Sequence, residues 1–276
     1  QSGSSTAEGY IGLSDDRQLL VTAGYNSSVG TAGVSSSVIT LFPTNARVVG
    51  KINAAGVADT KTTLNNASSA SAIRSATTVD GSAFWTAGQA LICYVPDGNI
   101  SAPTTLSSTN TRVISIFNNQ LYTTTQSGAT LRLAKVGTGL PTSGSPTLTN
   151  LNGFLTSTGD PYSFSFIDIN GGGPDIVYVA SLNTAPAGLL KYTSSDNGAT
   201  WVSRGSITGN VFGLTAVYRS CGSTGNVDLY ITSNTSNAKP NSLYQFTDVA
   251  VSVGSPSNIT SNGLALNTVG TLLATA

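Results

Sequence analysis

One short strand signature recurs along the chain, and this repetition constrains the fold more than any other feature. Each copy has an apolar strand, a tight polar turn and a second apolar strand. Asp80-Gly81, between two alternating segments, is a strong hairpin signal. The second strands carry aligned anchor residues, 37 to 64 residues apart: Val21, Trp85, Tyr122, Tyr178 and Tyr230. Self-similarity at such a period is typical of a repeat architecture.

The repeats predict an all-β fold. No segment has a sustained helical period, so helix is expected to be negligible. Four-stranded antiparallel sheets stacked around an axis bury both of their faces, which favours a β-propeller. Five repeats are visible, and the strand at 271–274 is expected to share a blade with the first strand. This count favours seven blades, with six as the alternative, in a single domain over residues 1–276.

Composition restricts the partners. Charged residues make up only 9% of the 276 residues and the net charge is zero. The arginines and lysines are scattered, which argues against a nucleic-acid partner. No apolar run has the length of a membrane span. Because the chain starts at Gln1 and contains no methionine, we expect a processed product.

The side chains that are absent argue against common catalysis. The chain has no histidine, which excludes histidine-based triads and the usual zinc sites. Glu8 is the single glutamate. Glycosidases need paired carboxylates, and most aspartates here fall in predicted turns. We therefore expect no enzyme activity and no cofactor.

Two cysteines and five sequons bear on the compartment. Cys93 and Cys221 fall in the second and fifth repeats, so we predict that no disulfide joins them. Each sequon sits in a predicted loop or strand end, where it either carries a glycan or stays unoccupied. The five asparagines are Asn26, Asn66, Asn99, Asn234 and Asn258.

One motif matches the Asp-box of sialidases and related propellers at every defined position. It comprises Ser194, Asp196, Gly198, Thr200 and Trp201. The aspartate accepts backbone N–H bonds in the turn, the glycine permits positive φ and the tryptophan is buried between sheets. The motif therefore predicts a hairpin in a blade and is poor support for catalysis.

A second loop resembles the calcium loops of integrin-type propellers. Asp168, Asn170 and Asp175 would supply oxygen ligands to Ca²⁺. The loop is one residue short and has Gly172 where a third acid is expected. A wide glycine-rich turn without metal is the favoured alternative.

Two arginines occupy equivalent places on the first strands of adjacent repeats. Arg74 and Arg112 each precede a turn by the same spacing. First strands line the channel of a propeller, where two guanidinium groups could hold a carboxylate or sulfate. The alternative is that they pair with channel aspartates or backbone carbonyls.

Most of the chain is similar to large uncharacterised secreted propeller proteins of bacterial type. The likeness rests on three stretches: 71–85, 109–122 and 136–142. It implies an extracellular or cell-surface propeller that lacks outer strands at one or both ends, and it transfers no catalytic residue.

Two functions from different classes remain. The first is a non-catalytic structural or adhesive glycoprotein of a surface, matrix or filament, whose partners are glycans, other extracellular proteins or its own copies. The second is a carbohydrate-binding lectin. A glycoside hydrolase of sialidase type is a distant third, held only by the Asp-box.

Overall fold

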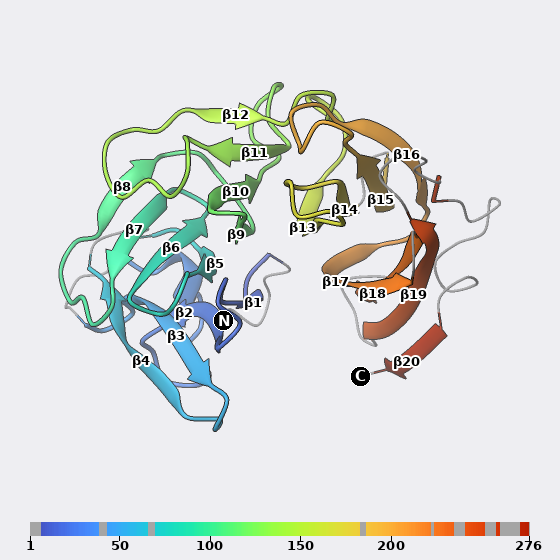
Figure 1. Ribbon diagram of the computed structural model, residues 1–276. Helices are drawn as coiled ribbons and strands as arrows, with labels where there is room; N and C mark the ends of the chain where they lie inside the picture. Colours follow the sequence, from blue (N-terminus) through green and yellow to red (C-terminus); the bar gives the residue numbers. More distant parts are fainter. Residues whose placement is uncertain are drawn as a thin grey trace. The chain divides into compact units, whose positions relative to one another are not determined.

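The computed structural model describes residues 7–38, 43–65, 70–182, 186–221, 224–234, 241–251, 258–259 and 271–275. They fold into five four-stranded sheets (Figure 1). The short 3₁₀ turn η1 (Val34–Ser36) is the one helical element of this part of the chain. The all-β prediction is confirmed. The number of blades stays a prediction.

Each sheet takes its strands in chain order. The first sheet contains β1 (Ile11–Leu13), β2 (Leu19–Tyr25), β3 (Arg47–Asn53) and β4 (Ala58–Leu64). The second contains β5 (Ile73–Thr77), β6 (Ala83–Gly88), β7 (Ile92–Pro96) and β8 (Thr104–Ser107). The third contains β9 (Ile114–Phe117), β10 (Gln120–Thr124), β11 (Leu133–Val136) and β12 (Leu148–Asn150).

The last two sheets have the same plan. The fourth contains β13 (Pro161–Ile167), β14 (Ile176–Ser181), β15 (Gly188–Thr193) and β16 (Val202–Ile207). The fifth contains β17 (Val211–Cys221), β18 (Thr224–Asn234), β19 (Asn241–Val251) and β20 (Thr271–Thr275). Neighbouring strands within the sheets pair antiparallel, as predicted.

The chain forms two compact units. One contains residues 1–127 and 134–149, and the other contains residues 128–133 and 150–276. In the first unit β1, β5 and β9, the first strands of three sheets, follow one another in contact (Figure 1). In the second unit β13 and β14 contact β17. A single domain over 1–276 stays a prediction.

The cores lie between neighbouring sheets. In the first unit Val21 and Val49 of the first sheet pack with Ile73 and Phe84 of the second. In the second unit Tyr178 packs with apolar residues of both of its sheets. Each fully buried side chain of this size contributes about 1.5–3 kcal/mol. Packing between neighbouring sheets therefore contributes to the stability of each unit.

The repeat signature located the second strands correctly. Its anchors fall on the second strand of each sheet: β2, β6, β10, β14 and β18. Val21, Trp85, Tyr122 and Tyr178 are buried, while Tyr230 is half-buried. Val21, Trp85 and Tyr178 belong to apolar clusters that span neighbouring sheets.

The expectation that the first and last strands share a blade is wrong for the described strands. β20 pairs with β19 and completes the fifth sheet. The first sheet obtains all four strands from residues 11–64. β20 pairs with residues 242–245 of β19, inside the strand expected from sequence, and so occupies the edge of the fifth sheet.

Candidate functional site

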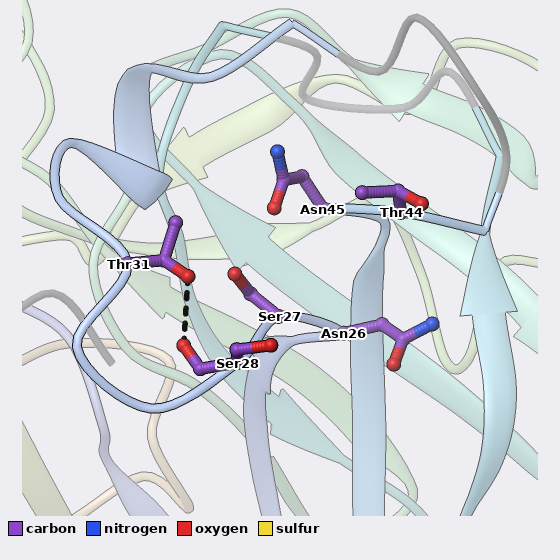
Figure 2. Close-up of a pocket in the computed structure, with 6 residues that line it drawn as sticks. All are labelled: Asn26, Ser27, Ser28, Thr31, Thr44 and Asn45. Atoms are coloured by element: carbon purple, nitrogen blue, oxygen red, sulfur yellow. Dashed lines mark hydrogen bonds between the residues drawn. The ribbon is translucent and has the colours of Figure 1, made fainter.

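An open polar pocket lies in the first unit beside the end of β2 (Figure 2). Its volume is about 550 Å³. The lining consists of amide and hydroxyl side chains: Asn26, Ser27, Ser28, Thr31, Thr44 and Asn45. Such groups offer both donors and acceptors, which suits a polyhydroxylated ligand.

The loop that forms this pocket is fixed by local bonds. The backbone N–H groups of Asn26 and Asn45 donate to the carbonyls of Ala46 and Asn26 at 2.8 and 2.9 Å. The hydroxyl of Thr31 donates to the Ser28 carbonyl at 2.8 Å (Figure 2). Asn45 adopts φ 57°, a left-handed conformation that asparagine tolerates. The loop that lines the pocket is therefore preorganised.

The asparagines of two sequons differ in how many hydrogen bonds their side-chain amides donate. The exposed Asn26 donates one side-chain bond, to the Pro43 carbonyl at 3.1 Å. The half-buried Asn99 donates to the carbonyls of Thr63 and Ser101 at 2.9 and 2.7 Å. A glycan on the Asn99 nitrogen would displace one of these bonds. The geometry thus favours Asn26 as the acceptor.

The other sequons are placed only in part. Asn258 is exposed. Asn66 lies outside the described residues, and Asn234 is described only as the last backbone position of β18. Occupancy of all five sequons stays a prediction.

The residues of the Asp-box motif lie at the turn between β15 and β16. The Ser194 hydroxyl donates to Asp196 at 2.7 Å, and the N–H and hydroxyl of Thr200 donate to Asp196 at 2.8 and 2.6 Å. The hydroxyl of Thr200, followed by the other donors, lowers the pKa of Asp196 to about 2. Gly198 has φ 84°, and Trp201 is buried. These bonds tie the carboxylate into the hairpin.

The glycine-rich loop between β13 and β14 also closes with its own bonds. Asp168 accepts N–H bonds from Asn170, Gly171 and Gly173 at 2.6–3.1 Å. Asp175 accepts the Ile169 N–H at 2.7 Å through one oxygen, while its other oxygen is buried without a hydrogen-bond partner. Burial and then the charge of Asp168 raise the pKa of Asp175. Within the described ranges no group of three His, Cys, Asp or Glu side chains could hold a metal. The calcium site stays a prediction.

The two arginines contact the protein itself. Arg74 donates to the Asn110 side chain at 2.6 Å and to the Thr111 carbonyl at 2.8 Å. Arg112 donates to the Gln126 side chain at 2.9 Å. Arg74 therefore joins β5 to the segment that leads into β9. These bonds favour the alternative in which the arginines pair with groups of the protein rather than with a bound anion. An anion at these residues stays a prediction.

Sequence reasoning missed a more deeply buried arginine. Arg47 begins β3 and is fully buried. Its guanidinium donates at 2.7–3.1 Å to the carbonyls of four residues: Ser35, Ser37, Asn45 and Ser71. The acceptors come from three separate segments, so no local spacing could have revealed the site.

A buried charged group in the second unit was also missed. Lys191 of β15 and Asp248 of β19 are both buried, and their Nζ and Oδ2 atoms are 2.5 Å apart. The signal that could have found it is the lysine within the apolar strand 188–193. A lysine in a strand that is buried throughout needs a buried partner.

Of the two cysteines, the structure describes the side chain of Cys93. Cys93 is a free, buried thiol, and burial raises its pKa to about 11. The side chain of Cys221 lies outside the described residues, so the absence of a disulfide stays a prediction. Cys93 packs in the core between the first and second sheets, as expected of a small apolar side chain.

Comparison with known proteins defines the class of fold. No family model matches the chain, and no curated protein matches it. A chain from the crystal structure of the nidogen/laminin complex matches with a TM-score of 0.50 and 13% identity. The match covers 96% of this chain and 83% of that chain.

The neighbour is a β-propeller, and this protein has the β-propeller fold. At 13% identity the likeness concerns the fold alone. In the described part of the chain no helix has the length and apolar character to cross a membrane.

Proposed function

We propose that the protein is a non-catalytic extracellular propeller that acts through surface contacts, as a structural or adhesive component of a cell surface, matrix or filament. One observation carries the proposal: most aspartates are already engaged in turns and ion pairs. Nine of the chain's aspartates bond within the fold: Asp16, Asp59, Asp80, Asp97, Asp168, Asp175, Asp196, Asp228 and Asp248.

The pairs between sheets illustrate this use of charge. Lys51 of β3 donates to Asp97, which follows β7, at 2.8 Å. The Thr62 hydroxyl of β4 donates to the same carboxylate at 3.0 Å. Asp97 thereby ties the first sheet to the second. A carboxylate held by cations and hydroxyls is stabilised in its charged form and is a weak general acid.

The proposal agrees with the scarcity of charge. Charged residues make up only 9% of the chain, so hydroxyl and amide side chains are its main polar groups. Contacts through such groups suit glycans, other extracellular proteins or further copies of the same chain. Electron microscopy of the native material would distinguish monomers, rings and polymers.

A panel of glycosides and esters tests the absence of catalysis. The recombinant protein is expected to hydrolyse none of them above the background of a heat-denatured sample. Turnover that disappears in an Asp196→Asn or Asp175→Asn variant, while the fold persists by circular dichroism, would replace the proposal with an enzyme.

A lectin is the second candidate, and the polar pocket beside Asn26 favours it. A glycan array with the wild type and a Thr44→Val variant is the test, because this change removes one exposed hydroxyl from the lining and keeps the shape. Saturable binding that weakens in the variant would favour the lectin over the structural role.

Glycosylation is a separate part of the proposal. The native protein is expected to carry a glycan at Asn26 and none at Asn99, because both amide hydrogens of Asn99 are bonded. Glycopeptide mapping before and after glycosidase treatment measures both sites. Full occupancy at Asn99 with none at Asn26 would show that folded geometry does not select the acceptor.

A further inference from the structure

The second unit buries an amine, a carboxyl group and a phenol against one another. Lys191, Tyr178 and Asp248 are 0%, 0% and 5% exposed. Lys191 and Tyr178 are register partners on β15 and β14, so their side chains share one face of the fourth sheet. Asp248 comes from β19 of the fifth sheet. The cluster therefore bridges two sheets.

The distances within this cluster are short. Lys191 Nζ lies 2.5 Å from Asp248 Oδ2, and the Tyr178 hydroxyl donates to the same oxygen at 2.6 Å. Tyr178 also belongs to the apolar core between the two sheets. The burial of all three side chains keeps bulk water away from the amine and the carboxyl group.

We propose that Lys191 and Asp248 become joined by an intramolecular isopeptide bond. The neutral amine attacks Asp248 Cγ, the Nζ–Cγ bond forms and the Cγ–Oδ2 bond breaks. Oδ2 leaves as water with two of the three ammonium hydrogens, and the amide nitrogen keeps the third. The positive and negative charges cancel, so the step needs no oxidant, reductant or co-reactant.

Tyr178 is a positioning residue in this step. Its hydroxyl donates a hydrogen bond to Oδ2, the oxygen that leaves, and so helps that oxygen to take up a proton. Burial, followed by the charge of Asp248, raises the pKa of Tyr178, so the phenol keeps its proton as a donor. The bond would link the fourth and fifth sheets covalently.

Intact mass under denaturing conditions tests the bond. The wild type is expected to be lighter than its sequence mass by one water, and trypsin should leave the bond after Lys191 uncut in a peptide joined to Asp248. The control is Lys191→Arg, which keeps the positive charge and is expected to have its full sequence mass. Loss of water at Asp80-Gly81 would give the same mass change, but it would appear equally in the wild type and in Lys191→Arg. The peptide map locates it.

A Tyr178→Phe variant separates the role of the phenol from that of the pair. It is expected to form the bond at least several-fold more slowly during refolding, as read from the fraction of joined peptide with time. Equal rates would overturn the role of Tyr178. A folded wild type with full sequence mass, cut by trypsin after Lys191, would overturn the bond itself and leave an ion pair.

Discussion

Arg47 gives a direct test of how the first unit is held together. The fully buried guanidinium is bonded to the carbonyls of Ser35, Ser37, Asn45 and Ser71, and it lies 5.3 Å from the centre of the Tyr25 ring. Burial lowers its pKa. The perturbation is Arg47→Met, which keeps the length of the side chain and removes every donor.

The size of the effect follows from the orphaned carbonyls. A buried acceptor without a donor costs about 1–3 kcal/mol, so four of them set an upper range of about 4–12 kcal/mol. Removal of the buried cation also removes its desolvation penalty of several kcal/mol, which stabilises the variant. Water can reach some of the carbonyls, which lowers the cost further. We expect a net loss of about 3–4 kcal/mol, which lowers the Tm by about 6–16 °C at about 2–4 °C per kcal/mol.

The assay is thermal unfolding followed by tryptophan fluorescence. With Trp201 replaced by phenylalanine, Trp85 reports on the first unit, where it donates to the Pro141 carbonyl at 2.7 Å. The matched control is Arg17→Met in the same background, because Arg17 is exposed. A Tm for Arg47→Met that equals that of the control would refute the reasoning, since the carbonyls would then be satisfied without the guanidinium.

Three further predictions concern single side chains. The folded pKa of Asp196 lies below its unfolded value, so the wild type loses stability as pH falls toward 2. Asp196→Asn should therefore lower the Tm at neutral pH and remove this loss of stability in acid. A Tm that falls with pH as steeply in the variant as in the wild type would contradict this. Asp175 has a raised folded pKa, so its ionisation costs stability as pH rises through that pKa. Asp175→Asn should therefore gain stability over the wild type at pH values above the folded pKa of Asp175. A Tm increase with Ca²⁺ that is lost in this variant would instead support the calcium loop. Cys93, with a pKa of about 11 and 1% exposure, should react with a thiol reagent only after unfolding, and rapid native labelling there would contradict its burial.

Local patterns carried the part of the fold that sequence could predict. The anchors at Trp85, Tyr122 and Tyr178 identified second strands because apolar residues on a buried strand face repeat from sheet to sheet. The hairpin at Asp196 was predictable because a serine, an aspartate and a glycine close that turn within a few residues. Both signals depend on neighbours in sequence.

Long-range pairing was beyond these patterns. Arg47 gathers acceptors as far along the chain as Ser71, and no spacing specifies that geometry. Lys191 meets Asp248 only because β15 and β19 belong to adjacent sheets. The strand at 271–275 was assigned to the first sheet because a ring of blades was expected to close by joining its two ends, whereas this strand pairs with residues 242–245 of β19.

The consecutive order of strands within every sheet has an evolutionary consequence. A duplicated stretch of DNA encoding one sheet would add a complete structural module, without any need to rethread the remaining polypeptide. The same locality lets a nascent chain assemble one module after another as it emerges. Relatives that differ in length by whole modules are therefore accessible through single recombination events.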